Sequence, residues 1–189
     1  MKRGRTKRIP AVLAVVGGAL WLTGCGSGAP SAAPSPTTVA RTMTILPGKM
    51  DGKPGWPKYT PADWTAPVGA KVALTIVSYD DGPSPLPSGS PFATVQGTTS
   101  GTEWVDGKPV SHVNPQEVAH TFTIPAMHLN LVIPAAPRGG KITVKATFNM
   151  PAHAGQYGWQ CEAPCGTGPN GMGGPMMTPG WMEGTVSAR

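Results

Sequence analysis

Two cysteines four positions apart, Cys161 and Cys165, are the residues of this chain with the clearest capacity for chemistry. The only other cysteine, Cys25, lies near the N-terminus. In an oxidising compartment an isolated pair of thiols usually forms a disulfide. The alternative is that both thiolates bind one soft metal ion, since sulfur ligands favour such metals. The spacing alone does not decide between these interpretations, so the surrounding sequence has to.

The first 25 residues are typical of a bacterial lipoprotein signal peptide. A basic start precedes the apolar run Ile9–Leu22, which is glycine-interrupted and shorter than the roughly 20 residues that span a bilayer. The run ends in Leu-Thr-Gly-Cys25, which resembles a lipobox, the motif whose cysteine is lipidated and becomes the mature N-terminus. A plain signal peptide with a chance cysteine is the alternative. The paired arginines of a twin-arginine signal are missing. We therefore expect export in the unfolded state and a lipid anchor at Cys25 on the extracytoplasmic face of the cell membrane.

Most of the positive charge belongs to this signal. The formal net charge is +6, but five basic residues precede Cys25, and the rest of the chain has ten Lys and Arg against nine Asp and Glu. A nearly neutral domain has no basic face for phosphates, so nucleic acid is not an expected partner. Residues 26–42 are mainly Gly, Ser, Ala, Pro and Thr, which predicts a flexible tether to a folded domain over 43–189.

The domain has the composition of an all-β protein. Glycine (26) and proline (23) are abundant, and no segment shows a helical period. The long turn-rich stretch 80–115 is expected to be a decorated loop or a partly ordered excursion. Alternating apolar and polar residues predict a β-sandwich with strands at 71–77, 118–124, 141–148, 156–161 and 184–187, and with residues 43–46 opening the sheet.

A family resemblance appears over 117–186. His120-Thr-Phe-Thr-Ile-Pro, an apolar strand and then Tyr157-Gly-Trp-Gln-Cys161-Glu-Ala-Pro-Cys165-Gly resemble the copper domain of cytochrome c oxidase subunit II, a member of the cupredoxin superfamily. The resemblance extends more weakly from about residue 60 and implies a cupredoxin-like Greek-key β-sandwich. It also implies that His120, Cys161 and Cys165 are copper ligands and that the carbonyl of Ala163 matches a further ligand.

The chain departs from that family at the second histidine ligand. Aligned by loop length, the histidine position is Pro169 and the closing methionine ligand is Met172. Aligned by the last strand, the positions are Pro179 and Met182, and we favour Met182 because strand register is harder to shift than loop length. Proline has no side-chain donor. The resemblance therefore implies one copper held by two thiolates, an imidazole and a thioether.

Several other residues could modify this site. His128 could fold back as a replacement ligand, whereas His153 is expected at the surface far from Cys161, and the position of His112 is not readable. Glu162 is expected to be solvated or to accept a hydrogen bond from a ligand histidine. Met172 and two further methionines, Met176 and Met177, are either flexible fillers of the loop or transient Cu(I) ligands.

Three functions remain open at this point. The first is membrane-anchored electron transfer with a redox protein as partner, and the second is Cu(I) carriage or copper resistance with a copper-handling partner. The third is a metal-free, disulfide-closed interaction module. No Ser-His-Asp set or carboxylate pair is visible, so an enzyme acting by itself is not expected. Subunit II proper has transmembrane helices before this domain, which argues against a standard oxidase subunit.

Overall fold

The computed structural model describes residues 37–189. The predicted signal peptide, the lipidation site Cys25 and the tether up to residue 36 lie outside the described residues. No helix among residues 37–189 is long and apolar enough to cross a membrane.

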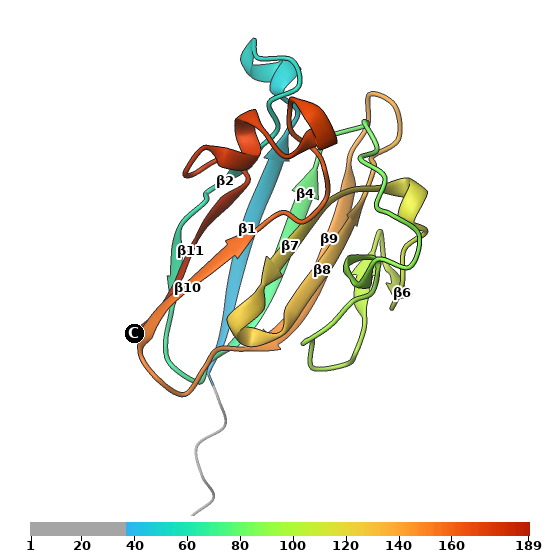
Figure 1. Ribbon diagram of the computed structural model, residues 1–189. Helices are drawn as coiled ribbons and strands as arrows, with labels where there is room; N and C mark the ends of the chain where they lie inside the picture. Colours follow the sequence, from blue (N-terminus) through green and yellow to red (C-terminus); the bar gives the residue numbers. More distant parts are fainter. Residues whose placement is uncertain (1–36) are drawn as a thin grey trace, which may run out of the picture. The chain divides into compact units, whose positions relative to one another are not determined.

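Two β-sheets form the domain (Figure 1). The six-stranded sheet has the order β2-β1-β4-β9-β5-β6 and the five-stranded sheet the order β3-β11-β10-β7-β8. The strands of the first sheet are β1 (Thr38–Leu46), β2 (Lys58–Thr60), β4 (Lys71–Ser78), β5 (Glu103–Val105), β6 (Lys108–Val110) and β9 (Ile142–Asn149). Those of the second are β3 (Trp64–Ala66), β7 (Val118–Ile124), β8 (Leu129–Pro134), β10 (Gly155–Gln160) and β11 (Glu183–Ala188).

The core fills the space between the sheets. Burial alternates along β4 and β9, which place Leu74, Ile76 and Phe148 inside and lysines and threonines outside. This alternation is what a pleated strand with one solvated face requires. The predicted all-β sandwich is therefore confirmed, and the strands predicted over 71–77, 118–124 and 141–148 correspond to β4, β7 and β9.

Strands β7 and β8 are buried on both faces, unlike β4 and β9. Their outer face is contacted by the long segment after β4, which contains β5, β6 and the short helices η2 (Pro91–Ala93) and η3 (Pro115–Glu117). The Asn130 side chain on β8 donates to the carbonyls of Phe92 and Thr94, at 3.0 and 2.8 Å. The backbone N–H of Val132 on β8 also donates to the carboxylate of Glu103 on β5, at 3.1 Å. The stretch 80–115 is thus an ordered cover over the two strands, because such bonds hold it both near η2 and at β5.

One predicted boundary is wrong. β1 begins at Thr38, inside the segment 26–42 that was predicted as a tether, and it pairs in parallel with β4 from Thr38 opposite Lys71. The folded domain therefore begins before residue 43. Threonine and valine favour strands. The backbone hydrogen bonds of this strand come from its parallel partner β4, which the composition of the segment alone does not indicate.

Four short helices connect or cap the strands near the ends of the sandwich. They are η1 (Gly48–Asp51), η4 (Pro125–Met127), η5 (Pro169–Gly171) and η6 (Gly174–Met177). In Figure 1, η1 and the loop that carries η5 and η6 lie at the same end of the domain. This end carries the candidate site.

Candidate metal centre

His120, Cys161 and Cys165 come together at this end. Their ligand atoms all lie within 4.8 Å of one another, and all three side chains are buried. His120 is on β7, and Cys161 follows the last residue of β10, which is paired with β7 through Gln160 opposite Thr123. Among residues 37–189 this is the only group of at least three His, Cys, Asp or Glu side chains that converge in this way.

The two cysteines are free thiols with their sulfurs 3.4 Å apart. A zinc- or copper-sized ion bound at about 2.3 Å from each sulfur would see them at an angle of about 95°. That angle is compatible with distorted tetrahedral coordination. The pair is therefore spaced to share one ion, and the arrangement described here is not the disulfide alternative.

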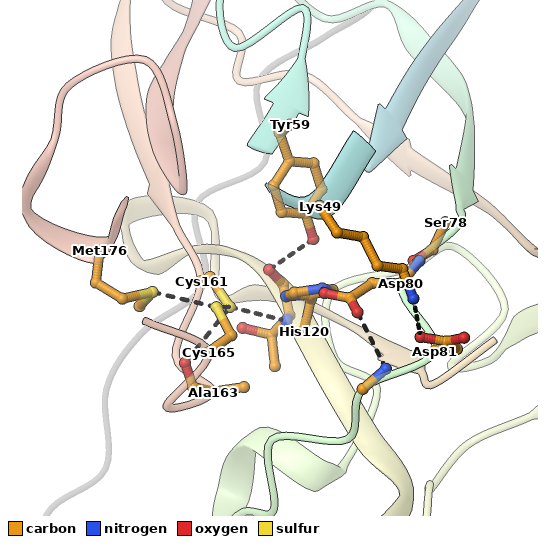
Figure 2. Close-up of polar contacts among 12 residues, drawn as sticks. Lys49, Tyr59, Ser78, Asp80, Asp81, His120, Cys161, Ala163, Cys165 and Met176 are labelled. Carbon is orange, nitrogen blue, oxygen red and sulfur yellow. Dashed lines mark hydrogen bonds and ion pairs between the residues drawn. The ribbon is translucent and has the colours of Figure 1, made fainter. Parts of the chain in front are cut away.

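The imidazole of His120 is oriented by Asp80. The Nε2 atom of His120 lies 3.0 Å from Oδ2 of Asp80, which stands just after the end of β4 (Figure 2). The other ring nitrogen, Nδ1, is buried and has no hydrogen-bond partner among the described residues. A carboxylate that accepts from Nε2–H leaves the lone pair of Nδ1 available for a metal. An orphaned buried nitrogen beside two thiols fits a metal site.

Charge is arranged within the group before any metal binds. Burial opposes ionisation of Cys161, but the hydrogen bond from Cys165 and the charge of the adjacent His120 outweigh it and hold the pKa of Cys161 well below its usual value. The hydrogen bond to Cys161 and burial raise the pKa of Cys165. Negative charge is thus favoured on Cys161 over Cys165, and the Cys161 sulfur also accepts from the backbone N–H of Thr121 at 3.4 Å.

His120 carries the matching positive charge. Burial alone would lower the pKa of His120, but the hydrogen bond to Asp80 and the negative charge of the neighbouring Cys161 sulfur raise it to about 9. Burial raises the pKa of Asp80, and the hydrogen bond with His120 more than compensates, so the Asp80 pKa is lowered overall. Metal binding therefore has to displace a proton from His120 and another from Cys165.

The structure places a further methionine, Met176, against a cysteine of the site. The sulfur of Met176, on η6, lies 3.2 Å from the sulfur of Cys165, toward which Figure 2 shows it pointing. Met172 is exposed. Met182 is fully buried in the core, where its backbone carbonyl accepts from the N–H of Cys161 at 2.9 Å. The thioether that contacts a cysteine is thus that of Met176, because the loop after Cys165 folds back on itself.

The fold of this loop explains why Met176 lies against Cys165. The N–H of Gly166 donates to the carbonyl of Gly171, and Thr167 and Gly173 form an isolated bridge. Gly171 has φ +64°, and a side chain there would collide with the carbonyl of Pro164. Only glycine fits this turn, which returns the chain to Cys165 and places η6 against it.

Neither proline that replaces the second histidine lies in the donor group. Pro169 is exposed in η5, and Pro179 lines a separate hollow beside β10 and β11. His128 is exposed as well, so it is not the replacement ligand that was considered. His153 is exposed as expected, and His112 is exposed, with its Nδ1 3.2 Å from the hydroxyl of Thr94. Within residues 37–189, the donor group thus contains a single imidazole, that of His120.

Buried polar contacts hold the ligand-bearing strands in place. The Tyr59 hydroxyl donates to the carbonyl of Thr121 at 2.9 Å, and its ring lies 6.2 Å from the ring of His120. The Thr121 hydroxyl accepts from the N–H of Glu162 at 2.7 Å and contacts the Thr123 hydroxyl at 3.0 Å, which donates to Asn130. This chain of bonds ties the cysteine loop to β7, β8 and the covering segment.

One side of the site is accessible. A hollow of about 270 Å3 is lined by Asp80 and Cys165 together with residues of the segments 47–57 and 82–84. Cys161 does not line it. The ion pair between Lys49 and Asp81, at 2.7 Å, lies beside this hollow, because Lys49 is one of its lining residues.

Sequence reasoning missed Asp80. It considered Glu162 either as a solvated side chain or as an acceptor for a ligand histidine, and the Glu162 carboxylate accepts from the exposed Gln160 side chain. Asp80 is 40 positions before His120 in the sequence. The only local signal was an aspartate pair directly after a strand that ends at the level of the site.

No family model and no curated protein matches this chain. Solved structures do show similarity. A variant of rusticyanin has 15% identity and a TM-score of 0.42, covering 82% of this chain and 79% of that one. Rusticyanin from Thiobacillus ferrooxidans has 17% identity and a TM-score of 0.39 over 82% and 79% of the two chains. Auracyanin B has 15% identity and a TM-score of 0.36, covering 83% of this chain and 92% of the other. At these identities the likeness concerns the fold alone.

Proposed function

We propose that this protein binds one copper ion through His120, Cys161, Cys165 and Met176 and transfers electrons. The observation that supports it is the convergence of one orphaned imidazole nitrogen and two thiols within 4.8 Å, beside a thioether. Two sulfur anions, an imidazole and a thioether form a soft donor set that suits copper. Zinc accepts two cysteines and a histidine but rarely a thioether.

Copper would supply a one-electron couple at this position. The residues of the chain keep the donor atoms in place while the charge of the ion changes. His120 is fixed by Asp80. Cys161 is fixed by the N–H of Thr121 on β7, which donates to its sulfur, and by the carbonyl of Met182, which accepts from its N–H. A site whose ligands are held by strands and by hydrogen bonds from neighbouring residues moves little between oxidation states, which favours fast electron transfer.

The family resemblance to the oxidase subunit supports the ligand assignment but not a binuclear centre. The family's second histidine is replaced by proline, and neither Pro169 nor Pro179 is in the donor group. The Ala163 carbonyl accepts from the N–H of Cys165 at 2.7 Å. A second ion would therefore have two shared thiolates and a carbonyl already engaged, so we propose one tightly bound copper per chain.

We further propose that the domain acts on the extracytoplasmic face of the cell membrane, tethered by lipid at Cys25. The support is the lipobox-like sequence that precedes it. Its partner would then be a redox protein accessible from the membrane surface.

A Cu(I) carrier is the second candidate. The hollow at Cys165 favours it, because an ion held next to an open cavity can be passed on. Metal analysis and spectroscopy of the purified domain separate the two. Electron transfer predicts one copper per chain, strong thiolate-to-Cu(II) absorption and a four-line Cu(II) hyperfine pattern. A colourless complex that resists oxidation supports the carrier. Two coppers with a seven-line mixed-valence spectrum refute the single-ion site, and a metal-free protein with Cys161 bonded to Cys165 refutes metal binding.

A further inference from the structure

The two thiols of the site differ in access. The side chain of Cys161 is 1% exposed, whereas that of Cys165 is 8% exposed and lines the hollow described above. Met176, the thioether next to Cys165, is also 8% exposed. An ion that reaches the site from outside therefore meets Cys165 and Met176 before it meets Cys161 and His120.

Methionines are unusually exposed around this side of the domain. Five large apolar side chains are exposed in the part of the chain that the structure describes, and three of them are methionines: Met50 at 59%, Met172 at 42% and Met177 at 75%. Met is among the residues most often buried. The remaining two, Val68 and Trp104, lie far in the sequence from the loop after Cys165. The large apolar side chains exposed on that loop are therefore both methionines, Met172 and Met177.

The segments that carry these methionines adjoin the site. Met172 and Met177 flank Met176 in the loop after Cys165, and Met50 follows Gly48 and Lys49, which line the hollow. The loop packs on the other segment, since the rings of Trp56 and Trp181 lie 5.3 Å apart, edge to face. Figure 1 shows both segments at the same end.

Met176 and Met177 are consecutive residues of η6, and they face opposite environments. The sulfur of Met176 contacts Cys165, while the side chain of Met177 is three-quarters exposed. Within one short helix, one thioether thus contacts the thiol of Cys165 and the next is presented to solvent. Thioethers bind Cu(I) and discriminate against harder ions.

We infer that Met177 and Met172 form a second, weaker, solvent-facing site for Cu(I), which delivers the ion to Cys165 and Met176. This inference rests on the proposed copper site. The transfer is a ligand exchange without change of oxidation state. The thioether–copper bonds to Met177 and Met172 break as the sulfurs of Cys165 and Met176 bond the ion, and the thiol proton of Cys165 leaves to solvent.

Silver(I) tests this, because it shares the charge and softness of Cu(I) and is not oxidised in air. The whole soluble domain, labelled with 13C at the methionine methyl groups, is titrated with Ag(I) and followed by NMR. We expect the Met176 methyl to shift with the first equivalent and the Met177 and Met172 methyls with the second. The double variant M172L/M177L should lose the second event and keep the first, and M43L, which changes a methionine of the core, should keep both.

Loading kinetics test the delivery. With Cu(I) supplied from a weak chelate, the double variant should load the tight site several-fold more slowly and reach the same final occupancy. Shifts confined to Met176 or to Met50, or equal loading rates, would overturn the inference while leaving the proposed function intact. Absence of any Met176 shift would instead overturn the proposed function, and the inference with it.

Discussion

Replacing Asp80 by asparagine should change how copper affinity depends on pH. Asp80 raises the pKa of His120 to about 9 through its hydrogen bond to Nε2, and this is the largest of the raising interactions. At pH 7 the proton on His120 therefore opposes metal binding by about 2.7 kcal/mol, at about 1.36 kcal/mol per pH unit. Asparagine removes the charge, so the pKa of His120 falls and this proton competition weakens.

The same substitution weakens the bound state. A carboxylate behind a ligand histidine typically contributes about 10- to 100-fold in metal affinity, or about 1.4–2.7 kcal/mol. The Asp80 side chain is 17% exposed, which favours the lower half of this range. The two effects oppose each other at pH 7. Above pH 9 most of His120 is already neutral, so D80N should there bind copper about tenfold more weakly.

Chelator competition for Cu(I) between pH 6.5 and 9.5 measures this. The logarithm of the affinity should rise with pH more steeply in the native protein than in D80N, by up to about one unit per pH unit between pH 7 and 9. Calorimetry in buffers of different ionisation enthalpy should show up to about one proton fewer released by D80N at pH 7.5.

D81N is the matched control. Asp81 is the adjacent residue, and its ion pair with Lys49 is at the surface, where such pairs contribute little to stability. D81N should follow the native curve. Parallel pH curves for D80N and the native protein, or an identical affinity above pH 9, would refute the assigned role of Asp80.

Four further outcomes follow from the structure. In a chelator titration, M176L should weaken Cu(I) binding about tenfold, or about 1.4 kcal/mol, whereas M182L should leave it unchanged. The reverse result would assign the ligand to Met182, the methionine favoured from the sequence. Y59F leaves the Thr121 carbonyl buried without its donor and should cost about 1–3 kcal/mol in denaturant unfolding, and an unchanged midpoint would contradict the contact. Burial raises the pKa of Glu103 from 4.5 to about 8, so between these pH values the folded state holds a proton that the unfolded state has lost, and the free energy of unfolding falls as pH rises. The full shift corresponds to about 4.8 kcal/mol, so E103Q should reduce this decline by a few kcal/mol. Equal pH dependence of unfolding in E103Q and the native protein would contradict it. C25S should release the protein from membranes in cell fractionation, whereas retention at the membrane with processing elsewhere would reject the lipid anchor.

The sequence alone determined the strands and part of the donor group. The alternation in β4 and β9 reflects a local rule, since successive side chains of a strand face opposite sides of the sheet. The Cys161–Cys165 spacing and the His120 strand were recognisable because these residues occupy short motifs. The covalent chain fixes such spacings without reference to the rest of the fold.

Other features were decided only by the tertiary structure. Asp80 reaches His120 because β4 ends at the level of the site in the opposing sheet, a distance relation that no local pattern encodes. The contact of Met176 with Cys165 depends on the packing of the loop that carries it against Trp56, a residue far away in the sequence. The strand at Thr38 likewise depends on a parallel partner more than 30 residues away. In each case the determining interaction joins residues distant in sequence, so its free energy becomes available only when the chain is folded.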